Sequence, residues 1–172
     1  MRNKAINRRR FLKRAAGTAA GAMSFPYIVS SSAFGASEKI TVGCVGVGPQ
    51  GSGVMGNFLR QKNAQVVAVC DVKDPVLKAA QKRVNNHYKG TGCSAYKDFR
   101  DVMARDDIDV ILAAPPDHWH VLIALAAVKS GKDVYLEKPM GLSLAQDQAL
   151  RTAVHRHGRV FQFGTQQRSS RN

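Results

Sequence analysis

Short apolar runs alternate with longer amphipathic segments from residue 39 onward. The runs KITVGCV, QVVAVCD, DVILAAP and DVYLE hold few polar side chains and many β-branched ones, which is typical of strands buried on both faces. We predict strands at 39–45, 65–71, 109–115, 133–137 and 159–164, and helices at about 51–62, 75–88, 96–107, 118–129 and 143–157. Strands that alternate with helices predict an α/β fold with a doubly wound parallel sheet.

The first 36 residues have a different pattern, with seven basic side chains, no acid and a weakly apolar Ala/Gly-rich stretch. This layout is typical of an export signal. Within it, Arg8-Arg9-Arg10-Phe11-Leu12-Lys13 resembles the core of twin-arginine signals, which direct folded proteins across the bacterial inner membrane. We therefore predict a twin-arginine signal peptide at 1–36, followed by one folded domain at 37–172.

This signal predicts the twin-arginine export machinery as a partner and a periplasmic or otherwise exported location. Cleavage after Gly35 or Ala36 fits the small residues there. An uncleaved anchor is the alternative, but Gly17, Gly21 and Pro26 interrupt the apolar stretch, so no stable membrane span is predicted.

Charge and cysteine content narrow the other classes of function. The chain has 26 Lys and Arg against 12 Asp and Glu, and half of the net charge of +14 lies in the first 36 residues. No nucleic-acid-binding motif accompanies the rest of this excess, so nucleic acid is not an expected partner. Cys44 and Cys70 fall in predicted strands and Cys93 in a probable loop, which indicates neither a disulfide framework nor a metal site.

A glycine-rich loop follows the first predicted strand. Gly46, Gly48 and Gly51 form G-x-G-x-x-G, with Pro49 and Gln50 between the last two glycines and a helix directly after. Asp71 ends the next strand, 25 residues beyond Gly46. In this arrangement the glycines and the helix N-terminus bind a pyrophosphate, and the carboxylate binds ribose hydroxyls. Asp71 favours NAD over NADP, because a carboxylate would repel the 2′-phosphate of NADP, while Lys73 leaves NADP open. We therefore predict that the domain at 37–172 is an NAD(P)-binding Rossmann domain.

Two further segments leave the carboxyl ends of predicted strands, where ligands bind in open parallel sheets. PPDHWHV carries Pro116, Asp117, Trp119 and His120, which are candidates to line the cofactor site, with helix capping by Asp117 and simple packing as the alternative. His118 and His120, two apart on a helix, would project in nearly opposite directions, so no metal site is predicted.

The second segment, Glu137-Lys138-Pro139, delivers charges to the same edge of the sheet. Lys138 beside a cationic nicotinamide ring would exchange a proton with a substrate hydroxyl, which makes it the candidate catalytic residue. Glu137 would accept from a ribose or orient the lysine. A surface salt bridge at a strand end is the alternative for this pair.

Together VGCVGVGPQGSG, AVCDV, PPDHWHVLIALAAVKSGKDVYLEKPM and FGTQQRS resemble the Gfo/Idh/MocA family over residues 39–170. The resemblance implies a nicotinamide-dependent enzyme of sugars or cyclic polyols, with Lys138 in the substrate site and Glu137 near the cofactor. It places Pro116, Asp117 and His120 in a loop usually read T-P-N-x-x-H, from which Pro115 and Asp117 depart.

Family members continue into a second α/β domain that supplies acid-base groups, so the chain is expected to be the N-terminal part of a longer enzyme, which would be able to form homo-oligomers. An NAD-dependent glycosidase of the same fold family and a non-catalytic dinucleotide-binding truncation are the alternatives. We expect the chain itself to bind cofactor without turning over sugar.

Overall fold

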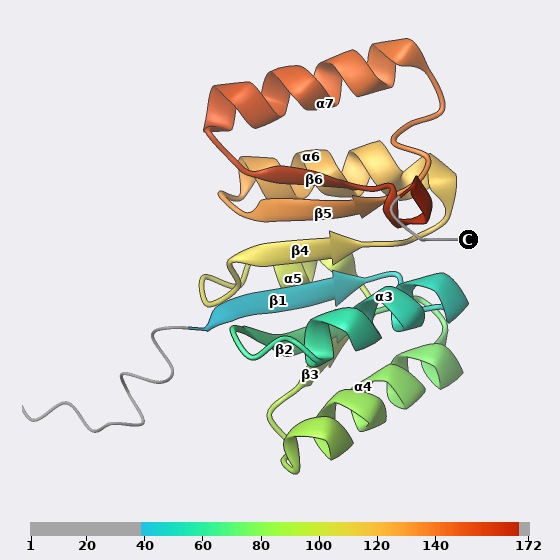
Figure 1. Ribbon diagram of the computed structural model, residues 1–172, viewed down its shortest axis with the longest axis vertical. Coiled ribbons are helices and arrows are strands. Elements are labelled where there is room, and N and C mark those ends of the chain that lie inside the picture. Colours follow the sequence, from blue (N-terminus) through green and yellow to red (C-terminus); the bar gives the residue numbers. More distant parts are fainter. Residues whose placement is uncertain (1–38, 169–172) are drawn as a thin grey trace, which may run out of the picture. The chain divides into compact units, whose positions relative to one another are not determined.

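The computed structural model describes residues 39–168, and within them six strands form one sheet in the order β3-β2-β1-β4-β5-β6 (Figure 1). Every neighbouring pair is parallel, which confirms the doubly wound α/β prediction. The strands are β1 Ile40–Val45, β2 Ala64–Cys70, β3 Ser94–Tyr96, β4 Val110–Ala113, β5 Asp133–Glu137 and β6 Phe161–Gly164. The helices are α3 Pro49–Leu59, α4 Asp74–Tyr88, α5 Phe99–Met103, α6 His120–Lys129 and α7 Leu144–His157, with 3-10 turns η1 Asp117–Trp119 and η2 Gln166–Arg168.

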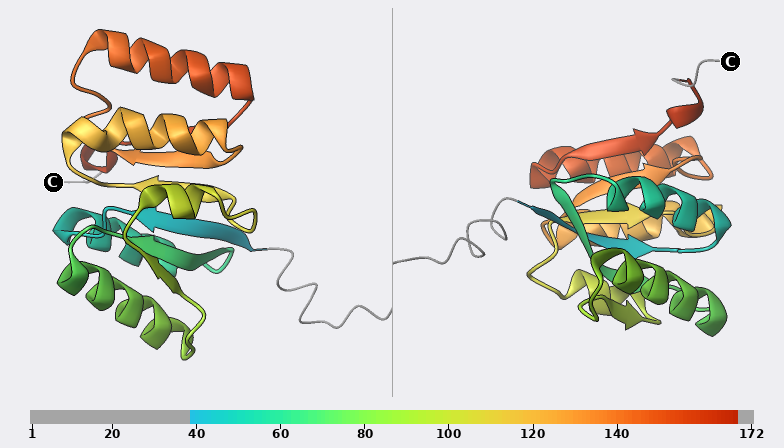
Figure 2. Two further views of the ribbon diagram at one scale, coloured as in Figure 1. Left: turned by 180° about the vertical axis from the view of Figure 1, so that it is seen from behind. Right: turned by 60° about the horizontal axis from the view of Figure 1, so that its bottom comes forward.

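Helices cover both faces of the sheet: α3 and α4 lie on one face, and α5, α6 and α7 lie on the other (Figures 1 and 2). Strand β4 shows why its sequence is continuously apolar. Ile111 packs with the α5–α7 cluster, whereas the next residue, Leu112, packs with the α3–α4 cluster, and both side chains are fully buried. Burying such a side chain stabilises the fold by about 1.5–3 kcal/mol, so both faces contribute to the core.

The order in which successive strands are added to the sheet reverses between β1 and β4. From β1 the strand order runs outward through β2 to β3, and from β4 it runs the other way through β5 to β6. Loops leaving the carboxyl ends of β1 and β4 therefore depart toward opposite faces and open a crevice between them. The glycine loop after β1 and the loop at 114–119 after β4 border this crevice.

Several predicted boundaries are wrong. The segment 96–107 is not one helix: β3 ends at Tyr96, and α5 spans only Phe99–Met103. A three-residue edge strand is too short for a recognisable pattern, and the Asp98 side chain starts α5 by accepting from the Arg100 N–H at 2.9 Å. Helix α3 begins at Pro49, two residues before the predicted start, because proline is favoured in a first turn where its missing N–H costs nothing.

Two other sequence-based expectations concern burial and targeting. Cys93 lies in a loop as predicted, but its side chain is buried against the α3–α4 cluster. The predicted signal peptide at 1–36 lies outside the described residues. In the described part of the chain, no helix combines the length and the apolar character that crossing a membrane requires.

Candidate cofactor site

The glycine loop that joins β1 to α3 is packed so closely that two of its glycines are required by the fold. Gly46 has φ +76°, and a Cβ there would lie 2.5 Å from the Pro115 nitrogen of the neighbouring loop. A Cβ on Gly51 would lie 1.9 Å from the Gly46 carbonyl oxygen. The loop after β1 therefore lies too close to the start of α3 and to the loop after β4 for a side chain at either position.

Gly48 has the opposite surroundings. A Cβ at this position would meet no protein atom within 4 Å, so packing within the chain does not require glycine here. The position directly precedes Pro49 and the first turn of α3, whose N–H groups have no intrahelical acceptor. Open space above a helix N-terminus is suited to a phosphate group, so the residues present fit the pyrophosphate of a dinucleotide.

Asp71 follows the carboxyl end of β2 and is bound at both carboxylate oxygens. Its Oδ2 accepts from the Val47 N–H at 3.0 Å, and its Oδ1 accepts from the Lys73 N–H at 3.0 Å. The side chain is half-buried at the rim of the crevice. Its charge therefore lies beside the glycine loop in a fixed orientation, where ribose hydroxyls would donate to it.

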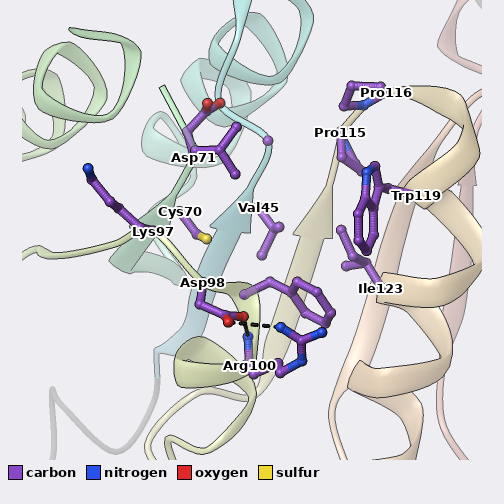
Figure 3. Close-up of a pocket in the computed structure, with 13 residues that line it drawn as sticks. Val45, Cys70, Asp71, Lys97, Asp98, Arg100, Pro115, Pro116, Trp119 and Ile123 are labelled. Carbon is purple, nitrogen blue, oxygen red and sulfur yellow. Dashed lines mark hydrogen bonds and ion pairs between the residues drawn. The ribbon is translucent and has the colours of Figure 1, made fainter. Parts of the chain in front are cut away.

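A cavity of about 350 Å³ opens next to Asp71. In Figure 3, Trp119 and Ile123 form one wall facing Val45, with Asp71 at one end and the Asp98–Arg100 pair at the other. The Trp119 ring meets Phe99 edge-on, with ring centroids 6.0 Å apart. Apolar walls with a carboxylate at one end suit an adenosine group, whose flat base packs against side chains while its ribose hydrogen-bonds.

The loop after β4 carries Pro116, Asp117 and Trp119 at the surface. Pro116 and Trp119 line the cavity, whereas Asp117 is exposed in η1. The alternative role for Asp117 as a helix cap is wrong, because its side chain caps neither η1 nor α6. The turn is instead closed by the Trp119 N–H, which donates to the Pro116 carbonyl at 2.9 Å.

His120 is almost completely buried, with 1% of its surface exposed. One ring nitrogen, Nε2, lies 2.9 Å from the Pro115 carbonyl oxygen, and Nδ1 contacts the Pro139 carbonyl oxygen. His120 therefore joins the loop after β4 to the loop after β5. Direct contact with a cofactor stays a prediction for Pro116, Asp117 and Trp119, and His120 supports the loop that carries them.

The residues after β5 divide into a buried carboxylate and an exposed ammonium. Glu137 is 2% exposed, and its Oε1 accepts from Gln166 Nε2 at 3.0 Å while its Oε2 accepts from the Lys138 N–H at 3.2 Å. Tyr135 Oη donates to Gln166 Oε1 at 3.2 Å. Lys138 itself is exposed at the carboxyl edge of the sheet. Glu137 therefore binds groups of the protein itself, whereas the Lys138 side chain is accessible to a ligand.

A model of the GFO_IDH_MocA family, described as "Oxidoreductase family, NAD-binding Rossmann fold", matches residues 40–165. The chain belongs to the Gfo/Idh/MocA family. NAD is therefore the cofactor of this domain. Cofactor contacts by the glycine loop and by Asp71 stay predictions.

Curated relatives in this family carry glycosidase names. "Glycosyl hydrolase family 109 protein 2" of Shewanella sp. (strain ANA-3) is 36% identical over 109 residues, covering 60% of this chain and 23% of that protein. A family 109 protein of Shewanella pealeana is 32% identical over 162 residues, covering 81% and 35%. The chain thus spans between about a quarter and a third of the length of these relatives.

Solved structures with a similar fold include a dehydrogenase and a reductase. Scyllo-inositol dehydrogenase from Lactobacillus casei, solved with NAD(H) and scyllo-inositol, is 26% identical, with a TM-score of 0.68 over 77% of this chain and 38% of that one. Biliverdin reductase from Synechocystis, at 22% identity and a TM-score of 0.64 over 72% and 37%, shares the fold.

Two parts of this candidate site were missed by sequence reasoning. The loop after β3, with Lys97 and Phe99, lines the cavity, but β3 itself was not predicted, so no strand end marked this loop. Gln166 follows the carboxyl end of β6 and binds the buried carboxylate of Glu137. The predicted strand at 159–164 ends at the same residue as β6, two residues before Gln166. Applying the strand-end rule to it would have found Gln166.

Proposed function

We propose that the chain is the cofactor-binding part of an enzyme that transfers a hydride between a sugar or cyclic polyol and NAD. The observation that carries this proposal is the placement of Lys138. Its side chain is exposed at the carboxyl end of β5, the edge of the sheet that also carries the glycine loop and Asp71. The scyllo-inositol dehydrogenase with bound NAD(H) and polyol supports the substrate class.

The proposed roles follow from exposure and hydrogen bonding. Lys138 Nζ binds the reacting hydroxyl of the substrate and takes its proton, which requires an accessible amine. Glu137 is held by Gln166 and by the Lys138 N–H, so it keeps the backbone at Lys138 in place. Bound NAD supplies the hydride acceptor.

The test uses the protein purified from its own cells, so that any further part of the enzyme is present. We expect NADH fluorescence to develop with inositols or aldoses, and Lys138→Met to abolish it while NAD binding is retained. Lys62→Met, at an exposed lysine before β2, is the matched control and should leave turnover unchanged. Equal turnover in the Lys138 and Lys62 variants would reject Lys138 as the catalytic residue.

A second candidate function is an NAD-dependent glycosidase, because the curated relatives described above are named family 109 glycosyl hydrolases. The two functions differ in their products. Cleavage of a chromogenic glycoside without net accumulation of NADH indicates the glycosidase, and NADH released in step with sugar oxidation indicates the dehydrogenase.

We also propose export through the twin-arginine route. Support comes from the Arg8-Arg9-Arg10-Phe11-Leu12-Lys13 run, which lies outside the described residues. The proposed location is the periplasm or another exported site.

A further inference from the structure

Charged side chains surround the cavity beside Asp71, and both cations among its lining residues are already paired. Lys97 Nζ lies 2.9 Å from Asp74 Oδ1 and 3.0 Å from Oδ2. Arg100 Nη1 lies 2.8 Å from Asp98 Oδ2. Within the described residues, the cavity therefore presents the carboxylate of Asp71 and two cations whose charge is offset by neighbouring carboxylates.

The two ion pairs have different structural roles. Asp98 also accepts the Arg100 N–H at 2.9 Å and caps α5, so this carboxylate belongs to the helix. Asp74 is the first residue of α4, and its pair with Lys97 joins that helix to the end of β3. In Figure 3 the Lys97 ammonium points away from Trp119 and the centre of the cavity.

The position of this bridge matters for the choice of cofactor. Asp74 lies three residues after Asp71, and Lys97 directly follows β3, the neighbour of β2 in the sheet. NADP differs from NAD by a phosphate on the ribose hydroxyl that a carboxylate at the end of β2 would bind. Asp71 and Lys97 both line the cavity, so a phosphate beside Asp71 would lie on the side of the cavity that carries Lys97. Without its carboxylate partner, the Lys97 ammonium would bind that phosphate through a charge-assisted hydrogen bond.

We propose that Asp74 is a specificity-determining residue: it withholds Lys97 from the 2′-phosphate of NADP and so adds to the preference for NAD that Asp71 creates. This inference rests on the proposed NAD binding by this chain. It assigns the Asp74–Lys97 pair a role in ligand selection, since the two side chains are 53% and 64% exposed and such exposed pairs add little to folding stability.

The test is a double-mutant cycle on the 172-residue chain, with NAD and NADP affinities measured by calorimetry and by displacement of NADH fluorescence. The variants are Asp74→Asn, Lys97→Met and the two combined. Asp74→Asn should tighten NADP binding roughly tenfold, the worth of one new charge-assisted bond, and change NAD binding less than about twofold. Lys97→Met alone should leave NADP affinity unchanged, and the combined variant should lose the gain.

Asp107→Asn is the matched control, because Asp107 is an exposed, ion-paired carboxylate outside the cavity lining and its replacement makes the same change in net charge. The cycle is repeated in an Asp71→Asn background, where repulsion of the phosphate is removed. If Asp74→Asn tightens NADP binding no more than Asp107→Asn in both backgrounds, or if the gain survives without Lys97, the proposal is overturned. A chain that binds neither dinucleotide would overturn the proposed function as well, whereas NAD binding without the gain overturns this inference alone.

Discussion

The Asp71 carboxylate at the end of β2 accepts a hydrogen bond from the Val47 N–H, in the glycine loop after β1, at 3.0 Å. Its other oxygen accepts from the Lys73 N–H. Two protein donors thus orient the carboxylate independently of any ligand. The same residue links the two segments that would bind the ribose and the pyrophosphate, so changes at Asp71 should alter both affinity and selectivity.

Asp71→Asn should weaken NAD binding about tenfold and narrow the difference between NAD and NADP, because an amide is a poorer acceptor for ribose hydroxyls and does not repel a phosphate. Calorimetry with both dinucleotides measures the change. Asp133→Asn is the control, since Asp133 also accepts from a backbone N–H, that of Val160, but lies at the first residue of β5, the opposite end of a strand. An unchanged NAD to NADP ratio in Asp71→Asn would contradict the assignment.

The glycines of the loop should separate binding from folding. Gly48→Ala should leave the free energy of unfolding nearly unchanged and weaken NAD binding, because its Cβ meets no protein atom within 4 Å. Gly51→Ala should lower the free energy of unfolding by about 1–3 kcal/mol or more, since its Cβ would lie 1.9 Å from the Gly46 oxygen. Denaturant unfolding and calorimetry check both.

Gly53→Ala is the matched control, because Gly53 lies in α3 and an added Cβ there would also meet no atom within 4 Å. It should stabilise the chain by about 0.8–1 kcal/mol, as expected for glycine replaced by alanine within a helix. A Gly48 variant that binds NAD as tightly as this control would show that the pyrophosphate does not pass over Gly48.

Gln166→Met should lower the free energy of unfolding by about 1–3 kcal/mol, because it removes the amide that donates to the buried Oε1 of Glu137 and leaves that acceptor unpaired. Gln162→Met, at an exposed glutamine of β6, should cost much less. Urea unfolding of the two variants provides the comparison, and equal losses would mean that the Gln166–Glu137 bond contributes little.

Stability should fall at alkaline pH. Burial, the main cause, raises the pKa of the Cys70 thiol from 9.0 to about 12 and that of Cys93 to about 11, and it also raises the pKa of Cys44. Because the pKa values are higher in the folded chain, this stabilisation is fully present below pH 9.0 and is lost as the pH rises toward the folded values. Each thiol adds a slope of up to about 1.4 kcal/mol per pH unit.

Urea unfolding between pH 7 and 10 measures the slope. Cys44→Ala should reduce the slope above pH 9, since it removes one thiol that ionises only in the unfolded chain. If the slope is the same in the variant and the parent chain, the loss of stability comes from other groups.

Replacing Arg8 and Arg9 by lysine should retain the protein in the cytoplasm, because twin-arginine recognition depends on guanidinium groups, which lysine cannot reproduce. Fractionation of bacterial cells measures the location. Arg2 and Arg14 replaced by lysine form the control with the same charge and should be exported normally. Export that is equal in both variants would indicate another route.

Sequence patterns found five of the six strands in the described part of the chain, four of its five α-helices and most strand ends that carry the site. Strands β1, β2, β4 and β5 are continuous apolar runs, since each is covered on both faces and has little freedom to vary. The short edge strand β3 was missed, because three residues pairing on one side carry no such constraint. Because β3 was missed, the loop at Lys97 and Phe99, which forms part of the cavity wall, was missed too.

The sequence by itself determined the parallel α/β fold, the glycine loop at 46–51 and the position of Asp71, because these depend on local spacing and on the rule that ligands bind at carboxyl ends of strands. Only the tertiary structure decided which polar groups bind one another. His120 contacts two carbonyls from different loops, Glu137 pairs with Gln166 29 residues away, and Asp74 pairs with Lys97 23 residues away. Such pairings depend on which strands become neighbours and on how side chains fill the space between them, and neither leaves a periodic signal along the chain.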